Sequence, residues 1–305
     1  MLAERLYGNG RSPGDVGLVS PIIGAWYGVT PNVRYMTIST LSGSTQWNSL
    51  TYLGPLSGTG DGYKTLFCRN SGTAYYGYMS FLSGSDAANF GFTSNNSVSS
   101  ALTNGSNDLA VFTAGYSTPS DYINMSSSSN AVSDGNIGTV GGAPYVSGNG
   151  VNDRGLRVQS YGDTRMSYWT ISTRSNSSTW GNGIDGYGMY PCNPVTSNDV
   201  NNRVVWANGV CGEGCSVTTI RYTDLTTIGS CTKFGDNTFS TWSPYALSNG
   251  INDTAIFGGG AYTNQGYNSS WRSYIKMSTP ANATSFANLE ILSADSTGAC
   301  SNARL

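Results

Sequence analysis

The chain has 305 residues, a formal net charge of −2 and only 10% charged side chains, against roughly 25% in an ordinary globular domain. It contains no histidine, which excludes Ser-His-Asp catalysis, imidazole metal ligands and histidine proton shuttles. The near-neutral charge leaves no basic surface for nucleic acid. The 12% aromatic content is unlike that of a disordered chain.

The longest apolar stretch, residues 18–29, is about half of the ~20 residues that a membrane-spanning helix needs. It lacks the basic flank and the small-residue cleavage site of a secretion signal. We therefore expect no membrane insertion and no signal peptide.

Short runs rich in Tyr, Ile, Thr, Val and Phe, bounded by Gly, Asn, Asp and Ser, predict strands joined by turns. No segment shows the apolar spacing of a capped helix over three turns. One alternating strand, usually led by tyrosine, recurs with ends 43 to 55 residues apart. Its six copies are residues 35–38, 78–81, 122–125, 168–171, 219–222 and 274–277.

Two further signals follow each of these strands. The first is an aromatic residue nine positions on, usually followed by a small residue and Asn or Asp. It is seen at Trp47, Phe90, Trp180 and Phe286, comes three residues late at Phe234, and is replaced by Asp134 in the third copy. The second is an Asn- or Asp-containing turn that feeds a short apolar strand, because such residues suit tight hairpins. Its copies are residues 104–108, 149–153, 198–202 and 249–253, with a degenerate first copy at 60–62.

Each unit of about 50 residues therefore predicts a small antiparallel sheet of about four strands, which must stack on its neighbours to be buried. Residues 4–10 look like the apolar strand of the repeat, and residues 298–305 look like the turn that precedes it. A ring closed by strands from both termini explains a repeat that is cut in its middle. We predict one all-β domain over residues 1–305, a six-bladed β-propeller. Its repeats span about 43–66 residues, and the C-terminal segment forms the sixth together with residues 1–34.

The order of strand, glycine pair, tyrosine-led strand and aromatic resembles the kelch repeat, most clearly at 255–260, 274–277 and Phe286. Residues 274–289 are similar, more narrowly, to kelch-like repeats in virion proteins of tailed bacteriophages, with weaker copies at 35–50 and 168–184. The chain departs from the kelch pattern because only Gly258, Gly259 and Gly260 keep the glycine pair. The resemblance implies a propeller with a structural or adhesive role in a virion, and it carries over no catalytic residue and no cofactor.

The search for chemistry gives little. Residues 58–65 suggest a phosphate-binding loop, but Tyr63 stands where the motif requires glycine. A two-carboxylate glycosidase is the main enzyme alternative. Most acids, such as Asp108, Asp153 and Asp253, lie at repeated turn positions, where a turn role explains them. The acids outside the repeat are Asp163, Asp185, Glu213 and Asp224. We expect no enzymatic activity and no metal site.

Aromatic residues outside the repeat positions are the candidate contacts for a glycan or a protein partner, although packing between blades is the alternative. They are Trp26, Tyr27, Trp242, Tyr245 and Trp271. Four cysteines close together in the sequence are disulfide candidates, with free or buried thiols as the other interpretation. They are Cys192, Cys211, Cys215 and Cys231.

These observations lead to one expected function and two alternatives. We expect a non-enzymatic structural protein of a tailed phage virion, mounted on the tail or capsid as decoration or as a host-surface adhesin. It would be assembled in the host cytoplasm and contact other virion proteins and, as an adhesin, a host surface glycan. The alternatives are a carbohydrate-binding or glycan-hydrolysing propeller and an intracellular kelch-type interaction module.

Overall fold

The structure is a computed structural model, and its described part consists of strands and the turns between them. The described residues are 16–20, 32–38, 40–41, 45–49, 57–60, 64–68, 75–80, 88–92, 98–103, 108–114, 120–134, 145–149, 152–158, 165–182, 195–198, 201–207, 218–239, 245–248, 253–259, 270–286 and 298–301. No helix of these residues is long and apolar enough to cross a membrane.

The described strands form six four-stranded sheets, numbered here 1 to 6 in chain order. In sheet 1 the strands lie in the order β24 (Gly298–Ser301), β1 (Val16–Ser20), β2 (Asn32–Thr37) and β3 (Thr45–Ser49). Sheet 2 holds β4 (Ser57–Gly60), β5 (Lys64–Cys68), β6 (Tyr75–Ser80) and β7 (Ala88–Phe92). Sheet 3 holds β8 (Val98–Thr103), β9 (Leu109–Ala114), β10 (Ser120–Asn124) and β11 (Val132–Asp134).

The remaining three sheets have the same order of strands. Sheet 4 holds β12 (Tyr145–Asn149), β13 (Arg154–Val158), β14 (Arg165–Thr170) and β15 (Ser178–Asn182). Sheet 5 holds β16 (Val195–Asn198), β17 (Arg203–Ala207), β18 (Thr219–Asp224) and β19 (Thr232–Asp236). Sheet 6 holds β20 (Tyr245–Leu247), β21 (Thr254–Gly258), β22 (Arg272–Lys276) and β23 (Thr284–Phe286).

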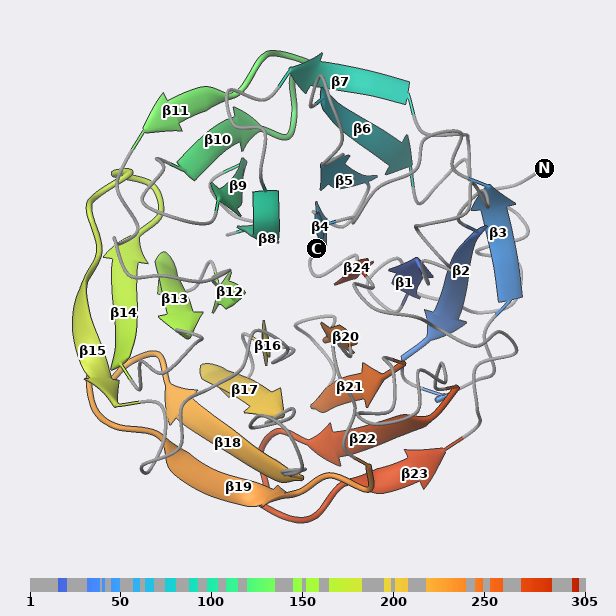
Figure 1. The fold of residues 1–305 in the computed structure, drawn as a ribbon, viewed down its shortest axis with the longest axis vertical. Helices are drawn as coiled ribbons and strands as arrows, with labels where there is room; N and C mark the ends of the chain where they lie inside the picture. The colour runs from blue at the N-terminus through green and yellow to red at the C-terminus, as the bar shows by residue number, and fades with distance from the viewer. Residues whose placement is uncertain are drawn as a thin grey trace, which may run out of the picture.

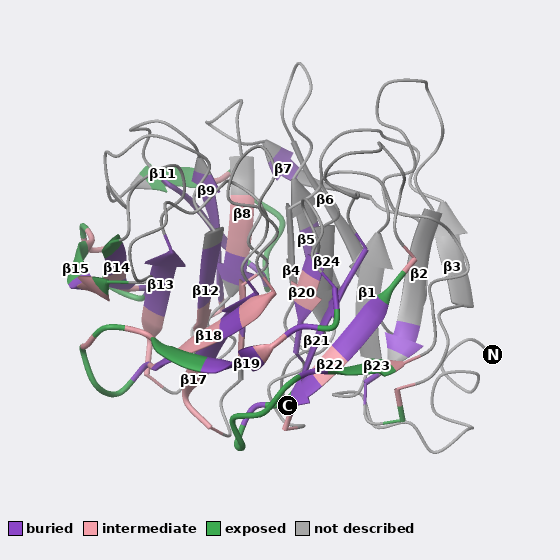
Figure 2. Ribbon diagram, turned by 60° about the horizontal axis from the view of Figure 1, so that its bottom comes forward, coloured by how far each residue is buried: buried purple, intermediate pink, exposed green. Residues whose placement is uncertain are grey.

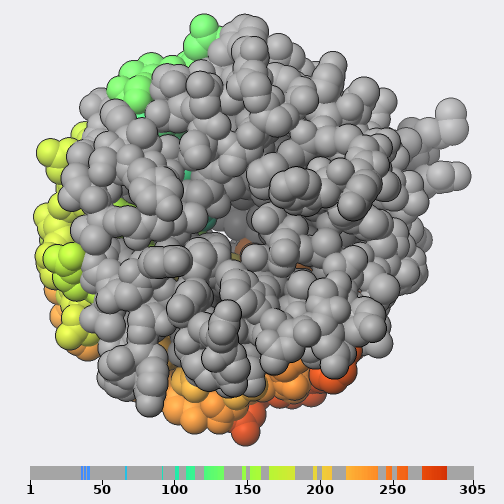
Figure 3. Space-filling model, in the orientation of Figure 1, coloured from blue at the N-terminus to red at the C-terminus, as the bar shows by residue number. Residues whose placement is uncertain are grey.

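The six sheets are arranged around a common centre, with the first strand of each innermost (Figure 1). Each innermost strand contacts those of the two neighbouring sheets, so that β4, β8, β12, β16, β20 and β24 form a closed ring. The third and fourth strands of sheets 3 to 6 lie at the outer rim. They belong to the coloured segments 120–134, 165–182, 218–239 and 270–286 of the space-filling view (Figure 3). This arrangement is a β-propeller, as the repeat predicted.

The two ends of the chain meet in sheet 1. The C-terminal strand β24 pairs antiparallel with β1, with Leu18 opposite Cys300 and Gly17 opposite Ser301. The sequence predicted a turn for residues 298–305, and this was wrong for its first four residues, which form a strand. The predicted N-terminal strand at 4–10 lies outside the described residues, and the strand that pairs with β24 is β1.

The hydrophobic core lies between sheets rather than within one. In strand β17, Val204 packs into a cluster with Leu156 and Trp180 of sheet 4, while its neighbour Val205 packs into a cluster with Phe257 of sheet 6. Successive residues of a strand point to opposite faces, so both faces of sheet 5 are buried against a neighbour. Figure 2 shows the same distribution, with buried residues along middle strands such as β13 and β17 and exposed residues on outer strands. The predicted need for stacking is therefore confirmed.

The fifth copy of the tyrosine-led strand needs a correction. The sequence placed its last residue at Tyr222, but the equivalent position is Leu225. The backbone N–H of Leu225 donates to the carbonyl of Asn202 at 2.7 Å, as that of Ile171 donates to the carbonyl of Asp153 at 3.0 Å in sheet 4. Leu225 is also fully buried, whereas Tyr222 is only partly buried. Phe234 then lies nine residues after the anchor, as in the other copies, and is not late.

Candidate functional site

The repeated aspartates cap the hairpin between the third and fourth strands of their own sheet. Asp253 Oδ1 accepts a hydrogen bond from the backbone N–H of Ser278 at 2.7 Å, and its Oδ2 accepts one from the Ser278 hydroxyl. The equivalent contacts join Asp108 to Ser126 and Asp153 to Ser172. These three carboxylates therefore have the turn role that the sequence predicted.

The backbone at this turn explains why Asn or Asp occupies it. Asp108, Asp153 and Asn202 have φ angles of 56°, 49° and 53°, a left-handed conformation that Asn and Asp tolerate better than most residues. In sheet 5 the turn residue is Asn202, and another acid serves the hairpin. Asp224 Oδ1 accepts hydrogen bonds from the backbone N–H and hydroxyl of Thr226 at 2.8 and 2.6 Å.

In sheets 4 and 5, the asparagine before the turn residue links its sheet to the next one. The side-chain amide of Asn152 in sheet 4 donates to Asn202 Oδ1 in sheet 5 at 2.7 Å. In the same way Asn201 in sheet 5 donates to Asp253 Oδ1 in sheet 6 at 2.6 Å. Reasoning from the sequence missed this role, although the recurring Asn-Asp or Asn-Asn pair in the aligned turns carries the signal.

Two arginines make a second link at the same end of the sheets. Arg154 Nη1 donates to the carbonyl oxygen of Leu225 in sheet 5 at 2.6 Å, and Arg203 Nη1 donates to that of Met277 in sheet 6. The Arg203 guanidinium also lies 4.8 Å from the centre of the Tyr222 ring, a cation–π distance. Both arginines directly follow the turn residue, which is a signal that the sequence analysis did not use.

The aromatic residue and the glycine after it form the outer part of the same junction. Tyr168 and Trp180 pack edge to face with ring centres 5.0 Å apart, and the Tyr222–Phe234 and Tyr274–Phe286 pairs repeat this geometry. A Cβ atom on Gly235 would lie 2.1 Å from the carbonyl oxygen of Ala281 in sheet 6. Phe234 therefore fills the inter-sheet core, and glycine is required at position 235 because the next hairpin lies against it.

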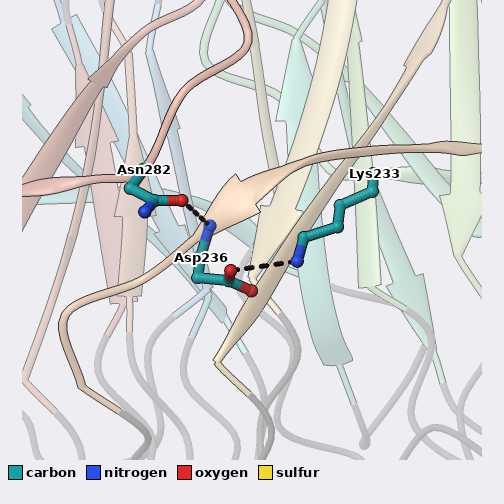
Figure 4. Close-up of polar contacts among 3 residues, drawn as sticks. All are labelled: Lys233, Asp236 and Asn282. Carbon is teal, nitrogen blue, oxygen red and sulfur yellow. Dashed lines mark hydrogen bonds and ion pairs between the residues drawn. The ribbon is translucent and has the colours of Figure 1, made fainter.

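The residue after that glycine bonds the next hairpin through its backbone (Figure 4). The backbone carbonyl of Asp236 accepts a hydrogen bond from the N–H of Ala283 at 2.8 Å. The backbone N–H of Asp236 donates to Asn282 Oδ1 at 3.0 Å. The Asp236 carboxylate is left to an exposed ion pair with Lys233 at 2.9 Å. Asn182 in sheet 4 makes the equivalent backbone contact with Cys231 of sheet 5 at 2.9 Å.

The third copy, which lacks the aromatic, has a different partner for its tyrosine. The Arg174 guanidinium, from the hairpin of sheet 4, lies 5.5 Å from the centre of the Tyr122 ring. Its backbone has a φ of 51°, and the hairpin folds back so that the N–H of Ser175 donates to the carbonyl of Thr170. In the third copy the tyrosine ring is therefore contacted by an arginine from the hairpin of the next sheet.

The structure describes two of the five candidate contact residues, because Trp26, Tyr27 and Trp242 lie outside the described residues. Tyr245 is 2% exposed and packs between sheets 6 and 1. Tyr245 therefore packs between sheets and is not an exposed contact for a partner. Burial raises the pKa of its hydroxyl well above the usual range, while the nearby Arg272 charge opposes this shift. Trp271, in contrast, is 42% exposed.

Of the four disulfide candidates, the structure describes only Cys231. Arg221 Nη1 lies 3.7 Å from its sulfur. Cys192, Cys211 and Cys215 lie outside the described residues, as do Asp163, Asp185 and Glu213, so a disulfide among the four cysteines stays a prediction. The described residues contain no group of three or more Cys, Asp or Glu side chains that could hold a metal ion.

The comparisons with known proteins agree with the fold. A chain of a solved nidogen/laminin complex superposes with a TM-score of 0.63 at 9% identity, covering 95% of this chain and 100% of that chain. A fungal alcohol oxidase of the AA5 family, solved in complex with copper, gives a TM-score of 0.61 at 12% identity, covering 91% of this chain and 66% of that chain. A Bacteroides thetaiotaomicron protein of unknown function gives 0.50 at 12% identity, covering 75% and 61%.

This chain therefore spans less than two thirds of the length of the last two proteins. Such low identities show a shared fold and nothing about ligands or activity. No protein-family model matches the chain, and no curated protein sequence matches it. The class that the fold defines is the β-propeller.

Proposed function

We propose that this protein is a non-enzymatic structural propeller of a tailed phage particle, mounted on the tail or capsid as decoration or host-surface adhesin. A single observation carries the non-enzymatic character of the proposal. The described acids and bases that recur in the repeat hold hairpins and sheets together, as Asp253 does with Ser278 and Asn201, and Arg203 with Met277. A two-carboxylate hydrolase would need acids pointing at a substrate instead.

We also propose that the six sheets are six kelch-like blades closed by strands from both termini. The pairing of β24 with β1 supports the closure. The glycine pair of sheet 6 has the tight surroundings that a kelch pair would need. A Cβ atom on Gly258 would lie 2.7 Å from the Tyr245 hydroxyl oxygen, and Gly259 has a φ of 69°.

The phage assignment rests on the resemblance of residues 274–289 to virion repeats. A chain poor in charged residues is compatible with durable contact with other virion proteins. We place the assembly of these contacts in the host cytoplasm.

The test is the location of the protein. Particles from a lysate that contains the protein at its natural level would be banded on a density gradient and analysed by mass spectrometry and immunogold labelling. We expect the protein in the particle band, with gold on the head or tail, and the same content after a second gradient at high salt. A protein found only in the particle-free fraction would overturn the virion role. Hydrolysis of an oligosaccharide panel by the purified protein would overturn the non-enzymatic role.

A further inference from the structure

Trp271 differs from the other tryptophans whose side chains are described. Trp169, Trp180 and Trp206 are all at most 2% exposed, and they fill the core between sheets. Trp271 is 42% exposed and, with Val132 and Ile228, is one of three exposed large hydrophobic residues in the described part of the chain. An indole that the fold does not bury is a candidate contact for a ligand.

The Trp271 ring contacts a residue that follows sheet 5, while its backbone is bonded within sheet 6. It packs edge to face on Phe239 of sheet 5, with ring centres 6.0 Å apart and planes at 83°. Phe239 is itself 5% exposed, within the cluster shared by sheets 5 and 6. The carbonyl oxygen of Trp271 accepts a hydrogen bond from the N–H of Gly259 at 3.0 Å, and the next residue, Arg272, is buried. A ring that already packs on a buried neighbour loses less conformational entropy when a ligand stacks on it than a side chain without such a contact.

The surroundings of Trp271 favour an uncharged ligand. Its described neighbours Ser270, Gly259 and Phe239 carry no charge, and the charged Arg272 that follows it is buried. Thr238, next to Phe239 in the sequence, is exposed. A charged ligand would be expected to meet an opposite charge here. A protein partner usually buries a cluster of apolar residues, but Val132 lies on sheet 3 and Ile228 lies in the hairpin after β18, at the strand ends opposite Trp271.

We infer that Trp271, supported by Phe239, is a stacking platform for a neutral saccharide. The C–H groups on one face of a pyranose ring carry partial positive charge, which suits the negative face of an indole. Hydroxyl groups such as that of Thr238 would bind the polar edge of the sugar. This inference rests on the adhesin form of the proposed function and names the class of its ligand.

The experiment uses the full chain on an array of neutral and sialylated oligosaccharides, followed by titration calorimetry with the neutral glycan that binds best. We expect binding to neutral glycans with little dependence on salt, because no charge is neutralised. Trp271→Ala should weaken binding at least about tenfold, as for a central aromatic contact. Trp271→Phe should retain some of the affinity, because a stacking ring remains.

Ile228→Ala is the matched control, because Ile228 is 51% exposed in the hairpin after β18, at the strand ends opposite Trp271. It should bind like the wild type, and the melting temperatures of all three variants will show whether folding is preserved. Absence of neutral-glycan binding, or equal binding by Trp271→Ala, would overturn the platform. Selective binding of sialylated glycans, or of a virion protein through Trp271, would also overturn it. The location experiment is independent, so the platform and the virion role can fail separately.

Discussion

The side-chain amide of Asn201 donates a 2.6 Å hydrogen bond to Asp253 Oδ1, and this contact joins the turn of sheet 5 to that of sheet 6. The same carboxylate holds the hairpin of its own sheet through Ser278. A single aspartate therefore serves two sheets at once, and Asn152 with Asn202 repeats the inter-sheet contact between sheets 4 and 5. These contacts therefore add polar links to the apolar packing between neighbouring sheets.

Replacing Asp253 should therefore destabilise the fold. Asp253→Ala leaves the Ser278 N–H and the Asn201 amide without their acceptor, and we expect a loss of about 1–3 kcal/mol in the free energy of unfolding. Asp236→Ala is the control, because that carboxylate makes an exposed ion pair with Lys233, which contributes below about 0.5 kcal/mol. Urea unfolding of both variants measures the difference. Equal losses would contradict the inter-sheet role of Asp253.

The glycine after the aromatic gives a sharp pair of variants. Gly235→Ala places a Cβ atom 2.1 Å from the backbone oxygen of Ala281, whereas a Cβ atom on Gly229 meets nothing within 4 Å. We expect Gly235→Ala to cost more than about 2 kcal/mol, because a backbone carbonyl must move. Gly229→Ala should change the stability by less than about 0.5 kcal/mol. Thermal melting of the two proteins decides this, and a tolerated Gly235→Ala would show that the junction is looser than described.

The corrected register of the fifth copy makes its own prediction. Leu225 is fully buried between sheets 4 and 5, while Ile228, three residues on, is 51% exposed. Leu225→Ala should cost about 2–5 kcal/mol through lost burial and a cavity. Ile228→Ala should stay within about 0.5 kcal/mol of the wild type. Chemical denaturation measures both values, and equal losses or the reverse order would contradict the register that ends at Leu225.

The buried hydroxyl of Tyr245 should make the free energy of unfolding fall at alkaline pH. Burial raises the pKa of its hydroxyl in the folded protein, whereas in the unfolded chain the pKa is about 10. The folded state keeps its full stability, as far as Tyr245 is concerned, below pH ~10. Above that pH the Tyr245 hydroxyl loses its proton in the unfolded chain while it keeps it in the folded protein, so the free energy of unfolding falls.

Tyr245→Phe removes this dependence. Between pH ~9 and ~11 the wild type should lose about 1 kcal/mol more than the variant. At neutral pH the variant should be at least as stable, because the buried hydroxyl has no hydrogen-bond partner among the described residues. Urea unfolding at both pH values tests this, and parallel losses in the two proteins would contradict it.

The aromatic residues show which features of the candidate site the sequence could predict. The spacing of Tyr168 and Trp180 identified a repeated pair, and the structure explains it as one edge-to-face contact in each of sheets 4, 5 and 6. The sequence also proposed Tyr245 and Trp271 together as exposed contacts. It could not separate them, because exposure depends on the neighbouring sheet, and of these two only Trp271 is exposed.

The sequence by itself determined the all-β class, the repeat and the turn chemistry. These follow from local rules, namely alternation along a strand and the left-handed backbone that Asn and Asp tolerate. Only the tertiary structure decided the fifth register, the strand at residues 298–301 and the links made by Asn201 and Arg203. These contacts join residues about 20 to 280 positions apart, so they depend on how strands pair and on which sheets become neighbours when the ring closes. Asp253 and Arg203 owe their structural roles to the same closure, because their inter-sheet partners come from the neighbouring sheet.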